Sequence, residues 1–463
     1  MKILKKQTKE HLILGNWIDD NGVETKKTVT LSTKNRLHNT LIVGPAGCGK
    51  TYQTIFPMIC QDIQMHNNSV GITLLESHGD LSENVYKFAK QYNENAATNL
   101  KRIQYFNPFF DHSSYFNPLV GKEKEVINNM LTAIHFLNVN QEFAFTNLHR
   151  NLITNAVKVV KCLHGDNATL CDLYNVICNV NNKGLNEYIL PLKTQKLQKE
   201  YIDIADWFIK NYYPNNELNT KTLIYQFTEN IRQLFANLMK NEQLIKVLNP
   251  PRIQEDNNNK HSVDNIVYQV DFEKAFEEGH IVILNSANDR LRELGKFVGY
   301  LIVLQLHTVM KNRKINESSI PNMVYIDDFQ NYSNWEFIQT LSSNKDYKIC
   351  MHLSVQYLSQ IRDDCNKSIS EYLKDVVYNC SRNKIFYTGV THEDAEYFTR
   401  LRKPYEPIWI STPCNLNISI KDLVNRNTKG TYLITKNDFD TDAEIKTIKY
   451  APINYKNFID KIC

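Results

Sequence analysis

A glycine-rich segment that directly follows an apolar run is the feature that most constrains the fold of this chain. It matches the pattern GxxxxGK[ST] in full and consists of Gly44, Pro45, Ala46, Gly47, Cys48, Gly49, Lys50 and Thr51. Residues 40–43, Thr-Leu-Ile-Val, precede it and predict a buried strand. A strand that leads through such a loop into a helix is the context in which this pattern binds nucleotide phosphates. A glycine-rich turn that matches by chance is the alternative, and the strand placement argues against it.

The residue types of this loop indicate its chemistry. Glycines let backbone N–H groups turn toward phosphate oxygens, and Lys50 reaches the β- and γ-phosphates. The hydroxyl of Thr51 can coordinate Mg²⁺. The sequence therefore predicts that residues 44–51 bind a nucleotide together with Mg²⁺.

Hydrolysis requires a second strand that ends in carboxylates, because the metal must be held and a water molecule oriented. Residues 323–326, Met-Val-Tyr-Ile, fit this role and are followed by Asp327 and Asp328. We expect Asp327 to bind Mg²⁺, directly or through water, and Asp328 to polarise the attacking water beside the γ-phosphate. A solvated turn is the other interpretation of two adjacent acids. Gln356 follows the apolar run 349–355 and is predicted to sense the γ-phosphate from a strand tip.

Short apolar runs rich in β-branched and aromatic residues alternate with stretches of helical spacing. The predicted strands are residues 40–43, 70–76, 102–106, 281–284, 323–326, 349–355, 384–388 and 431–435. Such near-continuous apolar strands predict a mostly parallel sheet covered by helices on both faces. Between about 122 and 248 this alternation stops, and long helices are predicted at residues 126–137, 148–163, 197–212 and 222–248.

We therefore expect four segments in an α/β protein. Residues 1–36 form a small, basic, β-rich segment, and residues 122–258 form an all-α insertion. The nucleotide-binding domain consists of two parts, 37–121 and 259–463.

The charge balance excludes binding of nucleic acid through bulk positive charge. The chain has 54 Lys and Arg against 50 Asp and Glu, and residues 1–36 hold the whole net charge of +4. Any contact with nucleic acid must therefore be local. The most apolar stretch, 297–310, is interrupted by Gln305 and His307 and is far shorter than the ~20 residues of a membrane span. The ten cysteines are scattered without a CxxC pair, which favours reduced thiols in the cytosol over disulfides or a zinc site. The sequence therefore predicts a cytoplasmic protein without a transmembrane segment.

Several short motifs occur in an order that resembles a known family. Beyond the glycine-rich loop these are Leu-Glu-Ser-His-Gly-Asp-Leu at 75–81, Asn-Pro at 107–108, Phe-Asn-Pro-Leu at 116–119, Leu-Gly-Lys at 294–296 with Arg313, Ile-Asp-Asp-Phe at 326–329, Ser-Val-Gln-Tyr-Leu-Ser-Gln-Ile at 354–361 and Asp-Ala-Glu at 394–396. From about His38 onward the chain resembles the conjugative coupling proteins of type IV secretion, the TraG/TraD group. That group belongs to the FtsK–HerA class of RecA-like P-loop DNA motors.

The resemblance implies a RecA-like domain that hydrolyses ATP with Mg²⁺ at the interfaces of a hexameric ring and drives DNA through a central channel. The implied partners are DNA, a relaxase or accessory proteins, and a membrane component of the secretion channel. The helical insertion would receive DNA or the relaxase. The family often has amino-terminal membrane helices, whereas this sequence encodes none, which argues against permanent anchoring in a membrane. A member of this kind could dock at the inner face of the membrane through a separate partner. Residues 1–36 are one candidate for that contact, and a solvated cap on the motor is the other interpretation.

The chain departs from the family pattern at three places. Asp328 stands where the family usually has Glu, which makes the carboxylate one methylene shorter. Glu-Ser-His at 76–78 stands where the family usually has Asp-Pro-Lys. Lys345 stands where relatives carry an arginine that reaches the nucleotide of the neighbouring subunit, and lysine lacks the bidentate fork. Three interpretations follow. Lys345 makes a weaker contact with the nucleotide of the neighbouring subunit, or another arginine such as Arg382 makes this contact, or hydrolysis is slow until the ring assembles on DNA.

Three functions compete on the sequence alone. The first is a conjugative coupling ATPase, the second a HerA-like or viral DNA-packaging motor, and the third a weakly hydrolysing P-loop regulator or scaffold. Neighbouring genes would separate the first two, and ATPase activity stimulated by DNA would separate both from the third.

Overall fold

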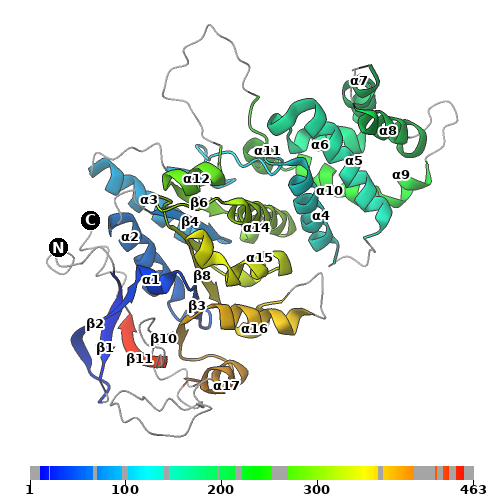
Figure 1. The fold of residues 1–463 in the computed structure, drawn as a ribbon. Helices are drawn as coiled ribbons and strands as arrows, with labels where there is room; N and C mark the ends of the chain where they lie inside the picture. The colour runs from blue at the N-terminus through cyan, green and yellow to red at the C-terminus, as the bar shows by residue number, and fades with distance from the viewer. Residues whose placement is uncertain are drawn as a thin grey trace. The chain divides into compact units, whose positions relative to one another are not determined.

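The chain folds into two compact units. The computed structural model describes residues 11–19, 21–65, 70–95, 103–139, 145–194, 198–213, 222–252, 269–362, 369–400, 423–424, 431–436 and 445–452. One unit, here called the sheet unit, comprises residues 1–104, 271–286 and 309–463. The other, the helical unit, comprises residues 105–270 and 287–308. Figure 1 labels the elements of both units.

The strands form one sheet in the order β2-β1-β11-β10-β9-β3-β8-β7-β4-β6-β5. Neighbouring strands from β9 to β6 in this order are parallel, whereas β10, β11, β1 and β2 continue the sheet with antiparallel pairs. The strands are, in chain order, β1 His11–Ile18, β2 Glu24–Ser32, β3 Thr40–Val43, β4 Gly71–Glu76, β5 Ile103–Phe106, β6 Ile281–Asn285, β7 Asn322–Ile326, β8 Ile349–Val355, β9 Asn383–Tyr387, β10 Thr431–Lys436 and β11 Ile445–Pro452.

The mostly parallel sheet predicted from the sequence is confirmed. Every residue of β3, β4, β6, β7, β8 and β9 is buried, which explains why these strands are near-continuous apolar runs. Each predicted strand is present, and no strand end differs from its predicted position by more than one residue. The strands β1, β2 and β11 were not individually predicted.

Helices cover the sheet, and α2 and α3 pack against each other beside β4 (Figure 1). The helices that lie wholly within the sheet unit are α1 Thr33–Arg36, α2 Phe56–Met65, α3 Asp80–Asn95, α12 Phe272–Glu278, α15 Trp335–Gln339, α16 Ser370–Cys380 and α17 His392–Arg400. Strand β1 is attached to α2 by Gln61, whose side-chain amide donates to the carbonyl of Ile13 and accepts from its N–H, both at 2.9 Å.

A buried charge network ties α1 and α2 to two central strands. Arg36 is fully buried, and its guanidinium donates to both carboxylate oxygens of Asp62 on α2 at 2.7 and 2.6 Å. It also donates to the hydroxyl of Tyr325 on β7 and to Nε2 of His352 on β8, at 2.8 and 3.1 Å. Burial, with the charge of Arg36, lowers the pKa of His352 well below its usual value, so this imidazole is neutral. Arg36 therefore belongs to the core and not to the basic surface of residues 1–36.

The helical unit contains the predicted all-α insertion. Its helices are α4 Glu123–Val139, α5 Asn147–His164, α6 Leu170–Cys178, α7 Leu190–Thr194, α8 Lys199–Trp207, α9 Leu223–Phe227, α10 Glu229–Met239, α11 Glu242–Leu248 and α13 Asn288–Leu291, and most of α14 Glu293–Asn312. The single helix expected at 222–248 is wrong, because the chain bends at Thr228 and again at Asn241. The side chain of Asn241 accepts from the N–H of Leu244 at 3.0 Å and starts a new helix there. None of the helices in the described ranges is both long enough and apolar enough to cross a membrane.

Candidate nucleotide site

The glycine-rich loop lies between β3 and a helix, as the sequence predicts. Residues 50–55 form a π-helical turn that continues directly into α2. Gly49 has φ +103°, a conformation that side chains rarely adopt. A Cβ atom on Gly44 would lie 2.7 Å from Sγ of Cys48 and 2.7 Å from Cβ of Tyr387. The tight path of this loop therefore requires glycine at both positions.

Lys50 folds back over the loop that precedes it. Its ammonium donates to the carbonyl of Gly44 at 2.7 Å and to that of Pro45 at 3.4 Å. Its residue surface is only 7% exposed. The positive charge is thus held inside the loop, at the place where phosphate oxygens bind in loops of this pattern.

Asp327 joins three elements at the carboxyl end of the sheet. Its Oδ2 accepts from the hydroxyl of Thr51 at 2.9 Å, and its Oδ1 accepts from the hydroxyl of Ser354 on β8 at 2.6 Å. Burial, with the charge of Asp328, raises the pKa of Asp327. A hydroxyl and a carboxylate side by side are the hard oxygen donors that Mg²⁺ prefers, so Thr51 and Asp327 fit the predicted metal pair.

Asp328 occupies a strained turn directly after β7. Its φ of +50° lies in the left-handed region, which is unfavourable for residues with a Cβ. Its Oδ2 is 3.3 Å from Nε2 of His78, and its Oδ1 accepts from the side-chain amide of Gln330 at 3.0 Å. Burial alone would raise the pKa of Asp328, but these hydrogen bonds and the charge of Lys50 lower it below its usual value. The carboxylate is therefore ionised and fixed by its neighbours.

Glu76 is a site residue to which sequence reasoning gave no role. It ends β4, the strand beside β7, and is 3% exposed. Its Oε2 accepts from the N–H of Ser82 at 2.9 Å. Burial, with the nearby charge of Asp327, raises the pKa of Glu76 to about 8. The only sequence signal for Glu76 and His78 was the departure of residues 76–78 from the family pattern.

Gln356 and Lys345 lie at opposite ends of β8. Gln356 follows the last residue of β8, and because β7 and β8 are parallel it emerges at the same edge of the sheet as Asp327. Lys345 is exposed in the turn before β8. The glycine-rich loop lies beyond the opposite end of β8, because β3 and β8 are parallel. The seven residues of β8, about 23 Å of extended chain, therefore separate the two ends of the sheet. Arg382, also exposed, directly precedes β9 and lies at that same distant edge. The structure therefore brings neither cation to the site of its own chain.

The turn that carries Lys345 is firmly anchored. The neighbouring residue Asn344 is fully buried, and its side-chain amide donates to Oδ1 of Asn39 at 3.2 Å. The amide of Asn39 donates in turn to the carbonyl of Leu341 at 2.8 Å. Lys345 is thus an exposed charge on a fixed support.

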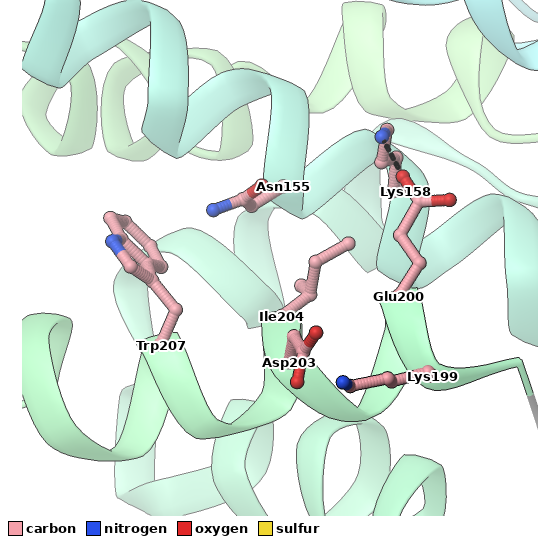
Figure 2. Close-up of a pocket in the computed structure, with 7 residues that line it drawn as sticks. All are labelled: Asn155, Lys158, Lys199, Glu200, Asp203, Ile204 and Trp207. Atoms are coloured by element: carbon pink, nitrogen blue, oxygen red, sulfur yellow. Dashed lines mark hydrogen bonds and ion pairs between the residues drawn. The ribbon is translucent and has the colours of Figure 1, made fainter.

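A separate hollow of about 500 Å³ lies in the helical unit between α5 and α8 (Figure 2). Figure 2 shows the ion pair of Lys158 and Glu200 at one end and Trp207 at the other. The lining residues are Asn155, Lys158, Lys199, Glu200, Asp203, Ile204 and Trp207. This mixture of both charges with one aromatic ring defines no particular ligand.

The fold and the site define a RecA-like P-loop protein with an inserted all-α domain, and solved structures share this fold. The plasmid coupling protein TrwB in complex with the non-hydrolysable GTP analogue GDPNP matches 96% of this chain and 95% of its own, with a TM-score of 0.56 and 10% identity. TrwB in complex with ADP and Mg²⁺ matches 98% of this chain and 91% of its own, with a TM-score of 0.56 and 9% identity.

VirB4 of Thermoanaerobacter pseudethanolicus has a TM-score of 0.51 and 10% identity, over 98% of this chain and 99% of its own. No family model matches the chain, and no curated protein matches its sequence. The likeness thus confirms the predicted fold and its similarity to the fold of conjugative coupling proteins.

The two adjacent acids should have separable roles. We expect Asp327→Asn to weaken Mg²⁺-dependent nucleotide binding, because Asp327 accepts a hydrogen bond from Thr51, the other residue of the predicted metal pair. Asp328→Asn should keep that binding and lose turnover by ~10²-fold, since orienting the attacking water affects the chemical step. Binding of a fluorescent nucleotide and steady-state ATPase rates measure the two effects. Equal losses of binding and turnover in both variants would contradict this division of labour.

Proposed function

We propose that this chain is an ATP-driven DNA-translocating motor, a conjugative coupling protein that hands DNA or a relaxase–DNA complex to a type IV secretion channel. The observation that carries the proposal is the 2.9 Å hydrogen bond between Thr51 and Asp327. It joins the glycine-rich loop and the acidic strand end into one site, within a fold that TrwB shares. TrwB is described as a plasmid coupling protein and has been solved with bound nucleotides.

In this proposal the loop amides and Lys50 bind the phosphates of ATP. Thr51 and Asp327 hold Mg²⁺, which when bound neutralises charge on the β- and γ-phosphates. Asp328 orients the attacking water, and Gln356 senses the γ-phosphate from the tip of β8.

The active form in this proposal is a hexameric ring. Transfer of the γ-phosphoryl group benefits from a cation beyond the P-loop lysine. Lys345 and Arg382 both lie at the edge of the sheet opposite to the loop of their own chain. A neighbouring subunit must therefore supply the charge, and Lys345 is our first candidate.

Assembly should control activity. We expect the specific ATPase activity to rise steeply with protein concentration, and DNA to increase both activity and assembly. Mass photometry together with ATPase assays, with and without DNA, measures this dependence. An active monomer whose turnover depends on neither concentration nor DNA would contradict both the ring and the DNA-motor function.

A further inference from the structure

The site contains three buried or half-buried carboxylates, and only one has an oxygen to spare. Both oxygens of Asp327 accept hydrogen bonds, from Thr51 and Ser354. Both oxygens of Asp328 are engaged as well, by His78 and Gln330. In contrast, Oε1 of Glu76 is buried and has no hydrogen-bond partner among the residues that the structure describes. This oxygen of Glu76 is therefore available to accept a hydrogen bond from a ligand.

The position of Glu76 in the sheet brings it beside the metal pair. Leu75 on β4 is paired with Ile326 on β7, and the N–H of Asp327 donates to the carbonyl of Leu75 at 3.0 Å. Glu76, the last residue of β4, therefore lies beside Asp327, the first residue after β7, about 4.8 Å away and on the same face of the sheet. The side chains of Glu76 and Asp327 therefore project from the same face at the same end of the sheet.

Two neighbouring buried carboxylates repel each other, and an unpaired buried carboxylate oxygen is costly. A cation, or a water molecule bound to one, between them would relieve both penalties. Mg²⁺ suits this place because it keeps several of its waters when proteins bind it, and these waters donate hydrogen bonds to carboxylates.

We propose that Glu76 is a third side chain of the Mg²⁺ site, whose free oxygen accepts a hydrogen bond from a metal-bound water. The inference rests on the proposed function, because it presupposes that Thr51 and Asp327 hold the metal. Glu76 acts from outside the inner coordination sphere, so it positions the metal and its waters. Residues at the end of β4 would thus support both Asp327 and Asp328, since Glu76 lies beside Asp327 and His78 contacts Asp328.

A purely structural role for Glu76 is the competing explanation. Its Oε2 accepts from Ser82 in the first turn of α3, as a helix-capping side chain does. Glu76→Gln separates the two roles, because the amide oxygen can still cap α3 while the side chain can no longer ionise when the metal binds. Glu83→Gln is the matched control, since Glu83 lies on α3, is exposed and pairs with Lys87 at 2.6 Å.

The experiment measures binding of a fluorescent ATP analogue while Mg²⁺ is titrated. In Glu76→Gln we expect the half-saturating Mg²⁺ concentration to rise about 10-fold, since outer-sphere partners of metal ligands typically affect metal affinity by 10- to 100-fold. Nucleotide binding in EDTA and the melting temperature without nucleotide should stay at wild-type values. Glu83→Gln should match the wild type in all three measurements.

An unchanged Mg²⁺ titration in Glu76→Gln would overturn the inference and leave the proposed function intact. Wild-type binding that does not depend on Mg²⁺ would instead overturn the proposed metal pair itself. If Glu76→Gln fails to fold, Glu76→Asp decides the question, because it keeps the charge but withdraws the oxygen by one methylene. A rise in its half-saturating Mg²⁺ concentration would support the inference, and a wild-type titration would overturn it.

Discussion

Replacing Lys50 by alanine should lower ATP turnover by about 10³-fold, because single groups that stabilise transition-state charge contribute 10²–10³ or more. The carbonyls of Gly44 and Pro45 hold the ammonium within the loop. Its loss leaves the charge of the β- and γ-phosphates without this partner. Steady-state ATPase assays at saturating ATP measure the effect.

Lys87→Ala is the control for this substitution. Lys87 is exposed and pairs along its helix with Glu83 at 2.6 Å, so its removal should leave turnover within about twofold of wild type. Hydrolysis at the wild-type rate by Lys50→Ala would show that residues 44–51 are not the active site.

Replacing Lys345 by alanine should lower DNA-stimulated turnover by about 10²-fold while nucleotide affinity changes little. An arginine finger contributes 10³–10⁵ in rate where it operates, and lysine contributes less because it approaches as a point charge. Lys345→Arg should accordingly keep or raise the activity. ATPase rates and nucleotide binding of both variants, measured at ring-forming concentrations, test this expectation.

Mixed rings give the sharper test of a contribution from the neighbouring subunit. Adding Lys345→Ala subunits to wild-type rings should lower their ATPase activity. It should be partly rescued by a Lys50→Ala subunit, because some interfaces then combine an intact loop with an intact Lys345. Full DNA-stimulated activity of Lys345→Ala alone would identify this residue as an ordinary surface lysine, and Arg382 would become the next candidate.

The sequence reveals those parts of the fold whose burial leaves a local pattern. The central parallel strands are buried on both faces and are therefore recognisable as apolar runs. Strand β2 lies at the end of the sheet and exposes most of its residues, so no such pattern marks it. In β1, a Cβ on Gly15 would lie 1.9 Å from the carbonyl oxygen of Ala451, a close approach set by the distant strand β11. The bend at Thr228 is hidden because apolar spacing continues through it.

The same distinction holds for the candidate site. Residues 44–51 and Asp327 carry their chemistry in contiguous motifs, so they are predictable from the sequence. Glu76 and His78 belong to the site only because β4 pairs with β7, although the two strand ends, Glu76 and Ile326, lie 250 positions apart in the sequence. The pairing of Arg36 with Asp62 likewise depends on how α1 and α2 pack, and charge counting alone places Arg36 on the surface.

The Arg36 network also determines which parts of the sheet unit can move relative to one another. Its hydrogen bonds connect α1, the helix that follows the glycine-rich loop, and the strands that carry Asp327 and Ser354. Separating these elements would leave a buried charge without its partner, at a free-energy cost of about 3–5 kcal/mol. We therefore expect them to travel as one rigid block through the hydrolysis cycle. In the proposed ring, the power stroke would then be a reorientation of whole subunits that passes from one subunit to the next.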